Sequence, residues 1–187
     1  MPRLNISDCT IILPYYMDSV ERYENLCCVY EYLKRKFHCK VIIVRYAGSN
    51  SNVPEGAVSL HLPGWNGVFH RTHVINEGIK FATTKYIAIW DVDCIFNVSA
   101  IEETVNILRN GVTLVYPYSG KFVDIDRAYI KEGCMIENHS YAMNSFGGAC
   151  FLNREDYIKC GMENEYLLNG WCHDDVERYE RVVKLGY

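Results

Sequence analysis

Apolar runs separated by mixed segments dominate the first two thirds of the chain. The runs at 10–13, 40–44 and 86–90 are almost wholly apolar over four or five positions. A strand that is covered on both faces has this composition, because neither face meets water. The segments 58–62 and 112–116 are of similar length and are rich in Val and Leu. The pattern therefore predicts five strands.

Between these strands, apolar positions recur at spacings of three and four, which is the period of an amphipathic helix. This spacing predicts helices at 18–37, 71–81 and 99–109. The first and third begin with capping-box sequences, at 18–21 and 99–102, which end in a glutamate. The positions of the first two helices that are expected to face the core are Leu26, Val29, Tyr30, Leu33, Val74, Ile75, Gly78 and Ile79.

The last third of the chain is less regular. We expect a strand at 149–152, a short helix at 154–160 and a final helix from Asp174. The apolar stripe expected on the final helix consists of Val176, Tyr179 and Val183. Alternating strands and helices predict an α/β fold with a mostly parallel sheet flanked by helices, and with ligands bound at the carboxyl ends of the strands. No linker interrupts the chain, so we expect one domain at 1–187.

The composition narrows the class of protein. Of the 187 residues, 49% are hydrophobic and 22% are charged, which is typical of globular domains. No apolar run approaches the length of about 18 residues that a membrane span needs, and the N-terminus lacks the apolar core of a secretion signal. Nine cysteines without a C-x-x-C pair predict reduced thiols rather than disulfides or a zinc site. We therefore expect a cytoplasmic protein.

Charge is unevenly distributed along the chain. The net charge is −4, and residues 1–119 carry equal numbers of acidic and basic residues, so the whole excess lies in 120–187. No basic stripe is present in either half of the sequence, which argues against a nucleic-acid partner.

Two aspartates directly follow the strand predicted at 86–90. Asp91 and Asp93 are one residue apart at a strand end, where a parallel sheet presents its ligand site. Both carboxylates can reach one divalent cation, and hard oxygen ligands suit Mg²⁺ or Mn²⁺. A cation placed there can bridge a diphosphate and neutralise its charge as it leaves. The alternative is a loop in which both aspartates cap the following turn.

A second polar group lies at the start of the final helix. Acidic residues suit the positive end of a helix dipole, so capping explains one of Asp174 and Asp175. It does not explain Gly170 and Trp171 just before them, and a carboxylate beside an indole can act as general base for a sugar hydroxyl. His173 matches no standard zinc spacing and is expected to face solvent or an acceptor.

Adjacent glycines at Gly147 and Gly148 form a third candidate. Glycine allows a backbone to approach a ligand closely, and it adopts positive φ without strain. A tight turn before the strand at 149–152 explains the pair equally well.

Taken in chain order, these segments resemble the GT-A glycosyltransferases, most closely the bacterial family 2 transferases and the β-1,4-galactosyltransferase-like group. Residues 69–78 are similar to an aromatic-x-R…N-x-G segment, and 91–93 to a D-x-D motif. Residues 146–149 and 170–175 are similar to a glycine pair followed by G-W-G-x-E-D. The resemblance covers nearly the whole chain.

The resemblance implies a GT-A (Rossmann-like) domain with a nucleotide-sugar-binding half at 1–119 and an acceptor-binding half at 120–187. It implies an inverting, metal-dependent transferase that uses Mn²⁺ or Mg²⁺ and a UDP-sugar. The sugar would be of the galactose or N-acetylhexosamine type, and the acceptor an oligosaccharide or lipid-linked glycan. The implied setting is surface polysaccharide synthesis, with peripheral contact to a membrane.

The resemblance also assigns roles to individual residues. Asp175 matches the catalytic base, and Asp93 matches the direct metal ligand, with Asp91 nearer the ribose or donor sugar. The residues matched to nucleotide-sugar binding are Pro14, Tyr15, Arg71, Asp91 and Val92. The residues matched to the acceptor and sugar pocket are Asp174, Trp171, His173, Gly147 and Gly148.

Three features depart from the family's pattern. Arg45 and Tyr46 follow the second strand, where an acidic residue often reads uracil. Cys172 replaces the second glycine of G-W-G. The family usually continues past Tyr187 and often supplies a metal-binding histidine there. We therefore expect either a truncated chain or a minimal domain with a weak metal site.

Two other classes of protein remain open. A phosphohydrolase of the haloacid dehalogenase type also has D-x-D at a strand end, but on its first strand, whereas here the motif follows three predicted strands. A non-catalytic module that binds sugar nucleotides or glycans is favoured by the early end of the chain. Turnover of a donor with and without acceptor separates these classes.

Overall fold

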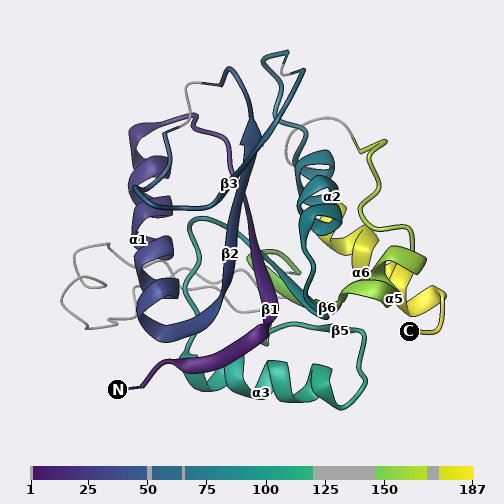
Figure 1. Cartoon of the computed structure of the whole chain (residues 1–187). Helices are drawn as coiled ribbons and strands as arrows, with labels where there is room; N and C mark the ends of the chain where they lie inside the picture. The colour runs from purple at the N-terminus through teal and green to yellow at the C-terminus, as the bar shows by residue number, and fades with distance from the viewer. Residues whose placement is uncertain (1, 50–51, 65, 120–145, 168–172) are drawn as a thin grey trace.

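The computed structural model describes residues 2–49, 52–64, 66–119, 146–167 and 173–187. A six-stranded sheet forms its centre, and helices pack on both faces (Figure 1). The strands are β1 (Leu4–Pro14), β2 (Phe37–Tyr46), β3 (Ser59–Leu62), β4 (Tyr86–Trp90), β5 (Leu114–Val115) and β6 (Ala149–Asn153). The helices are α1 (Val20–Lys36), α2 (Arg71–Phe81), α3 (Val98–Arg109), α5 (Arg154–Lys159) and α6 (Asp174–Lys184).

The strand order in the sheet is β3-β2-β1-β4-β6-β5. The first four of these strands run parallel to one another, and β6 lies antiparallel to both β4 and β5. The mostly parallel sheet expected from the sequence is therefore confirmed. Its exception, β6, begins directly after the glycine pair and lies beside the end of β4.

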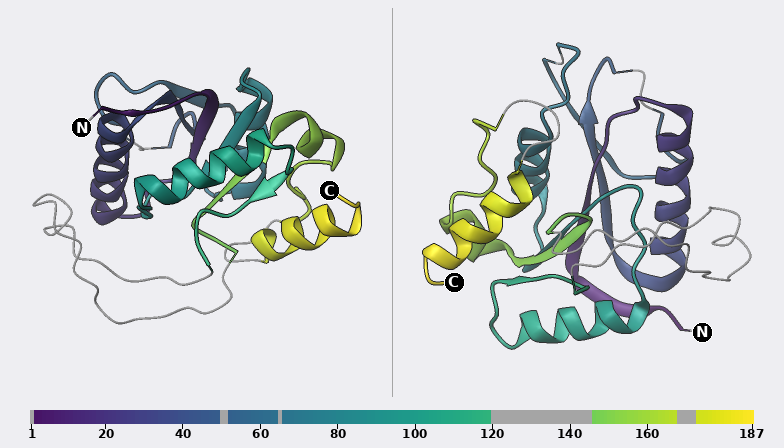
Figure 2. Two further views of the ribbon diagram at one scale, coloured as in Figure 1. Left: turned by 90° about the horizontal axis from the view of Figure 1, so that it is seen from below. Right: turned by 180° about the vertical axis from the view of Figure 1, so that it is seen from behind.

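Alternate residues of the central strands enter two separate cores. Ile11 and Leu13 pack in the core that includes α1 and α3, whereas Ile12 packs in the core that includes α2, α5 and α6. The two views of Figure 2 place α1 and the group of α2, α5 and α6 on opposite sides of the sheet. The core-facing positions predicted for the first two helices are buried: Leu26, Val29, Tyr30 and Leu33 on α1, and Val74, Ile75, Gly78 and Ile79 on α2.

Gly78 lets α2 approach the sheet closely. A Cβ atom built on Gly78 would lie 2.7 Å from Ile12 Cγ2 and 3.1 Å from Val44 Cγ2. Both methyl groups belong to buried β-branched side chains, which have little freedom to move aside. This close packing fixes the distance of α2 from the sheet, and with it the position of Arg71 at the start of the helix.

Three predictions about the helices are wrong. The first helix is capped by Ser19, whose side chain accepts the Arg22 N–H at 3.1 Å, and not through a capping box that begins at Asp18. The third helix begins at Val98 after Asn97, whose side chain makes no capping hydrogen bond, and not through a capping box at Ser99. On α6 the expected stripe faces outward: Val176, Tyr179 and Val183 are 36%, 38% and 53% exposed. The buried residues of α6 are Asp174, Arg178 and Val182. The reason is an internal ion-pair network, described below, that draws two charged residues inward.

None of the described helices is long and apolar enough to cross a membrane. The seven cysteines within the described ranges are free thiols. Cys134 and Cys172 lie outside those ranges.

Candidate active site

Asp91 is held at the end of β4 by the turn that precedes β6. The Asp91 N–H donates to the Gly148 carbonyl at 2.8 Å, and the Gly148 N–H donates to Asp91 Oδ2 at 3.2 Å. Gly148 has a φ of +82°, a left-handed conformation that favours glycine. Gly147 and Gly148 therefore form the predicted turn, in which the Gly147 carbonyl accepts the Ala149 N–H, and Gly148 also makes the close backbone contact with the first aspartate of the D-x-D segment.

Arg71, the first residue of α2, connects the two groups of aspartates. Its Nη2 donates to Asp91 Oδ1 at 2.7 Å, and its Nη1 donates to Asp174 Oδ2 at 2.5 Å. Asp175 Oδ1 lies 3.6 Å from the same Nη1. Burial opposes the charge of Arg71, but the three carboxylates outweigh it and raise the guanidinium pKa. The start of α2, the D-x-D segment and the start of α6, all predicted from the sequence as candidate segments, therefore meet at the guanidinium of Arg71.

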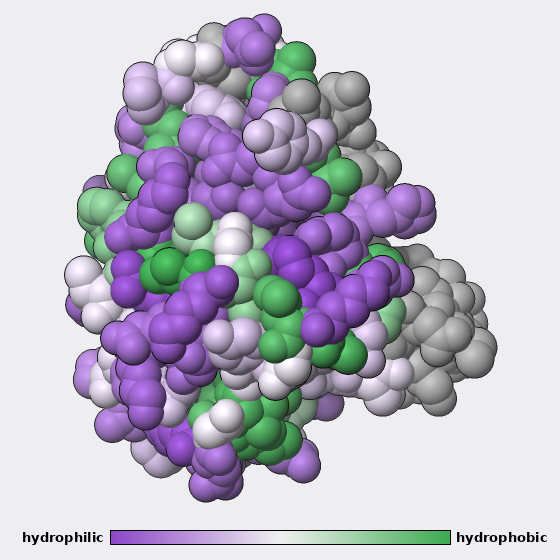
Figure 3. All heavy atoms as spheres, turned by 90° about the vertical axis from the view of Figure 1, so that its right-hand side faces the viewer, coloured by the Kyte–Doolittle hydropathy of each residue, from purple (hydrophilic) through white to green (hydrophobic). Residues whose placement is uncertain are grey.

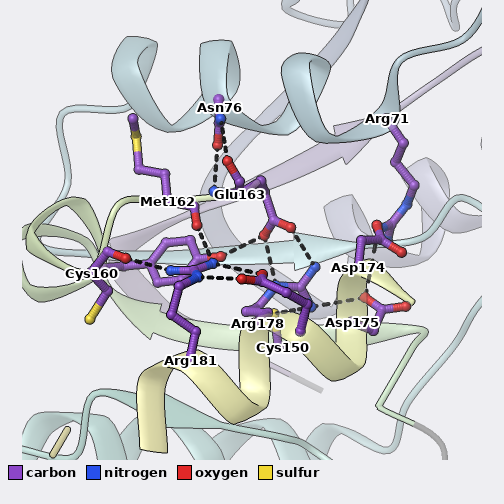
Figure 4. A network of polar contacts seen from close by, with 12 residues as sticks. Arg71, Asn76, Cys150, Cys160, Met162, Glu163, Asp174, Asp175, Arg178 and Arg181 are labelled. Atoms are coloured by element: carbon purple, nitrogen blue, oxygen red, sulfur yellow. Dashed lines mark hydrogen bonds and ion pairs between the residues drawn. The ribbon is translucent and has the colours of Figure 1, made fainter. Parts of the chain in front are cut away.

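Asp175 lies at the start of α6, as predicted, with a quarter of its side chain exposed. Its Oδ1 accepts a hydrogen bond from Arg178 Nη1 at 2.9 Å (Figure 4). Burial raises the pKa of the Asp175 carboxyl; Arg178 and Arg71 oppose the rise, and Asp174 and Asp91 add to it. A carboxylate with a raised pKa is a stronger base than an ordinary exposed aspartate.

Behind Asp175 lies a buried ion pair that the sequence reasoning missed. Arg178 and Glu163 are 1% and 0% exposed, and their charged groups meet at 2.7 Å. The available signal was the spacing of four between Asp174, Arg178 and Val182, which places them on one helix face. Charged residues are rarely buried unless they are paired. Without knowledge of the partner, Glu163, this spacing therefore predicts that the face with Asp174 and Arg178 is exposed to solvent.

Asp93 is the most open of the four aspartates, with 44% of its side chain exposed and Arg22 Nη1 at 3.7 Å. Burial raises the pKa of its carboxyl, and the charge of Asp91 adds to this. The described residues hold no cluster of three His, Cys, Asp or Glu side chains that would bind a metal by themselves. Magnesium is often held by one or two carboxylates together with substrate phosphates. Asp91 and Asp93 fit a cation that is completed in this way.

The residues matched to the nucleotide side are mostly buried. Pro14 is the last residue of β1, and Tyr15 packs in the core that includes α1 with 1% exposure. Burial raises the pKa of the Tyr15 hydroxyl to about 12, and no hydrogen-bond partner for it occurs in the described part of the chain. Val92 is 3% exposed. A ligand would therefore meet Tyr15 and Val92 through their backbone rather than their side chains.

His173 directly precedes α6 and is exposed. Its carbonyl accepts the Glu177 N–H at 2.8 Å, but its side chain makes no capping bond. Exposure agrees with the expectation that His173 faces solvent or an acceptor. Trp171 lies outside the described residues, so its place in the sugar pocket stays a prediction.

A pocket of about 260 Å³ opens beside the first turn of α2. His73 stacks on Tyr46 with ring centroids 6.3 Å apart, and its Nδ1 lies 3.0 Å from Glu165 Oε2. Figure 3 shows the side of the molecule that carries α2, α5 and α6, on which hydrophilic residues predominate. No motif in the sequence pointed to this pocket, which is lined by Tyr46, Pro63, Gly64, Asn66, His70, His73 and Glu165.

No protein-family model matches the chain, and no curated protein matches it. Among solved structures, it is similar to a Drosophila β-1,4-galactosyltransferase 7 variant in complex with manganese, UDP-Gal and xylobiose, with 18% identity and a TM-score of 0.61. The match covers 95% of this chain and 62% of that chain. The catalytic domain of the same fly enzyme with xylobiose gives a TM-score of 0.55 at 18% identity, over 98% of this chain and 62% of that chain.

A mannosyltransferase from Pyrobaculum calidifontis, in complex with GDP-Man and Mn²⁺, is also similar. Its TM-score is 0.57 at 16% identity, over 96% of this chain and 53% of that chain. The chain thus spans between about half and two thirds of the length of these enzymes. At these identities the likeness shows the fold: a GT-A glycosyltransferase sheet with its flanking helices.

Proposed function

We propose that the protein is an inverting, metal-dependent glycosyltransferase that moves a sugar from a UDP-sugar to a glycan acceptor. One observation carries the proposal: Arg71 joins Asp91 to Asp174 and Asp175 in a single site. The site lies where β4 ends and where α2 begins after β3, which is where sheets of this kind bind ligands. The fold shared with glycosyltransferases supports the same conclusion.

The proposed cofactor is Mn²⁺ or Mg²⁺, held by Asp93 with Asp91 beside it. When bound, the ion supplies positive charge at the donor diphosphate. Three carboxylates surround Arg71, and a fourth, that of Asp93, lies near Arg22. The four carboxylates outnumber the three arginines that face them, Arg22, Arg71 and Arg178, so the site is negative overall and would repel a diphosphate that arrived without a cation. Manganese is present in complexes of two of the similar enzymes, which supports this choice.

In the proposed reaction Asp175 takes the proton of an acceptor hydroxyl as that oxygen attacks the anomeric carbon. The bond between sugar and phosphate breaks, and the nucleoside diphosphate leaves from the opposite face. Inversion requires the base and the leaving group on opposite sides of the sugar. Asp175 suits this role because Arg71 lies between it and Asp91. Asp174 would orient the acceptor, and Arg71 would face the donor.

The finer assignments also belong to the proposal. Residues 1–119 would supply the donor site and 120–187 the acceptor site, within one domain. The donor sugar would be of the galactose or N-acetylhexosamine type, and the acceptor an oligosaccharide or lipid-linked glycan. The complexes of a similar enzyme with UDP-Gal and xylobiose support this class. A cytoplasmic role in surface polysaccharide synthesis, with peripheral contact to a membrane, completes the proposal.

The test is a donor turnover assay with Mn²⁺. UDP-Gal, UDP-GalNAc, UDP-Glc and GDP-Man are each incubated with the protein, with and without a panel of glycan acceptors, and released nucleoside diphosphate is measured. We expect release from a UDP-sugar that rises when the right acceptor is added. Donor binding without release under any condition would indicate a binding module, and release of inorganic phosphate would indicate a phosphohydrolase.

A further inference from the structure

All three nitrogens of the Arg178 guanidinium donate hydrogen bonds to side chains within the protein. Its Nε and Nη2 donate to Glu163 Oε1 and Oε2 at 2.7 and 3.2 Å, and its Nη1 donates to Asp175 Oδ1 at 2.9 Å (Figure 4). The same Nη1 lies 3.5 Å from Cys150 Sγ on β6. The paired donors match the two oxygens of Glu163, which is the bidentate geometry that fixes an arginine most firmly.

Glu163 is itself held from two sides. The Tyr157 hydroxyl of α5 donates to its Oε1 at 2.6 Å. Asn76 of α2 contacts its backbone twice: the Glu163 N–H donates to Asn76 Oδ1 at 2.8 Å, and Asn76 Nδ2 donates to the Glu163 carbonyl at 3.0 Å. The position of Arg178 is therefore determined by α2 and α5, and not by the candidate site in front of it.

Asp175 thus has two cationic neighbours of different kinds. Arg71 is 24% exposed and is shared among the carboxylates of Asp91, Asp174 and Asp175. Arg178 is 1% exposed, and its Nη1 contacts Asp175 Oδ1 at 2.9 Å. If Arg71 turns toward a bound diphosphate, the contact between Arg178 and Asp175 remains.

We infer that Arg178 is a positioning residue that orients Asp175 and keeps it ionised through its contact with Oδ1. A carboxylate has room for about four hydrogen bonds, so engagement of Oδ1 leaves Oδ2 to receive the acceptor's proton. The inference rests on the proposed function in giving Asp175 the role of base. The ion pair of Arg178 with Glu163 supplies the fixed counter-charge.

The charges around Asp175 explain why it needs such a partner. Among the described residues, Arg71 faces it from α2, Asp91 from the end of β4, and Asp174 and Arg178 from α6. Cys150 on β6 and Tyr116 after β5 are also close enough to interact with it. Burial raises the pKa of Asp175, and Arg178 opposes this more strongly than Arg71 does. Without Arg178, more of the Asp175 carboxyl would be protonated and unable to act as base.

The test must remove Arg178 without leaving Glu163 as a buried unpaired charge. The double variant Glu163→Gln/Arg178→Met removes both charges at similar volume, and replacing a whole buried ion pair is often neutral or stabilising. Arg178→Lys keeps the positive charge but loses the paired donors of the guanidinium, and it serves as the conservative variant. Arg181→Met is the matched control, because Arg181 anchors the same helix to the carbonyls of Cys160 and Met162 without contacting Asp175.

We expect the double variant to bind UDP-sugar with Mn²⁺ as the wild type does and to lose turnover by about 10²-fold, the usual cost of a misplaced catalytic group. Arg178→Lys should recover part of that loss, and Arg181→Met should keep the turnover of the wild type per folded molecule. In an Asp175→Asn background the double substitution should cost nothing further, since its effect passes through Asp175. Wild-type turnover in the folded double variant overturns the inference, as does an undiminished further loss in the Asp175→Asn background.

A second measurement, the titration of Asp175, does not depend on sugar transfer. Carboxyl carbon resonances followed by NMR, with the Asp175 signal identified from the Asp175→Asn spectrum, should show Asp175 titrating at higher pH in the double variant than in the wild type. Equal titration in the two proteins overturns the inference. If the wild type transfers no sugar while the titration shifts as expected, the proposed function has failed and the contact between Arg178 and Asp175 stands.

Discussion

The guanidinium of Arg71 lies between the carboxylates of Asp91 and Asp174, at 2.7 and 2.5 Å. Arg71 and Asp174 are 103 residues apart in the chain, yet this contact links the first residue of α2 with the first residue of α6. The aspartate that directly follows β4 and the aspartates that begin α6 therefore share one counter-ion. The arrangement of the site depends on that shared charge.

Replacing Arg71 by methionine should destabilise the protein in a way that depends on pH. Asp91, Asp174 and Asp175 would then face one another without their cation, and like charges in contact repel one another most when all of them are ionised. The repulsion is relieved where a carboxylate takes up a proton, so the loss of stability grows as pH rises. The melting temperature of Arg71→Met should therefore lie further below that of the wild type at pH 7 than at pH 5.

Arg109→Met is the control for this experiment, because Arg109 forms an exposed pair with Asp8. Exposed pairs contribute about 0–1 kcal/mol, so this variant should melt close to the wild type. A deficit of Arg71→Met that is the same at both pH values would show that Arg71 does not hold the three carboxylates.

Mn²⁺ and UDP together should raise the melting temperature more than either does alone. A ligand that binds the native state alone stabilises it by about 2.7 kcal/mol at 100 times its dissociation constant. Asp93→Ala should remove most of this gain, and Asp91→Ala less of it. Asp156→Ala, an acidic residue on α5 paired with Lys159, should keep the full shift. The metal assignment is wrong if UDP shifts the melt equally with EDTA and with Mn²⁺.

Much of the fold could be predicted because its central strands are wholly buried. The segments 86–90 and 71–81 are confirmed residue for residue as β4 and α2. The prediction of 10–13 found the buried part of β1 but not its first half, where residues such as Asn5 and Ser7 are not buried. Those polar residues conceal a strand from any reading that relies on apolar runs.

The residues of the candidate site could be predicted from the sequence, but the contacts between them could not. The order of the motifs pointed to Arg71, Asp91 and Asp175, yet nothing local to the sequence states that one guanidinium joins them. The pairing of Arg178 with Glu163 could not be predicted for the same reason, because the partners are 15 residues apart and Glu163 lies outside the helices, between α5 and α6. It also reversed the expected face of α6. Long-range charge pairing, rather than periodicity, decided which residues of α6 were buried.

The buried Glu163 should make stability depend on pH in the acid range. Burial alone would raise the pKa of its carboxyl, but Arg178 and the Tyr157 hydroxyl outweigh burial and lower it from 4.5. A lowered carboxyl pKa gives stability that is present above about pH 4.5 and lost as pH falls through the folded-state value. Glu163→Gln should therefore be less stable than the wild type at pH 7, and the difference should shrink toward pH 3.

Urea unfolding of both proteins across this pH range measures the difference in free energy. Glu155→Gln is the control, since Glu155 is an exposed acid on α5, and its stability should follow the wild type throughout. A difference for Glu163→Gln that stays constant down to pH 3 would mean that Glu163 is not ionised in the folded protein.

Gly78→Ala should destabilise the protein by about 1–3 kcal/mol, the usual cost of forcing extra volume into a packed core. The sign of this change in stability is informative, because alanine at an unhindered helix position is more stable than glycine by about 1 kcal/mol. Here the added methyl would lie 2.7 Å from Ile12 Cγ2. Lys80→Ala, at an exposed position of the same helix, should change stability little. Chemical denaturation of the two variants measures both effects, and a stabilised Gly78→Ala would contradict the close packing of α2 on β1.

The central claim, that Asp175 is the base of a sugar transfer, is tested most directly by donor affinity and turnover measured on one preparation of Asp175→Asn. Asparagine keeps the size of the side chain and its suitability at a helix start while removing its basicity. The account predicts normal folding, wild-type affinity for UDP-sugar with Mn²⁺, and turnover lower by about 10²–10⁴-fold, the contribution of a general base. A small loss of stability with wild-type turnover per folded molecule would contradict the account and leave Asp175 a structural residue of the first turn of α6.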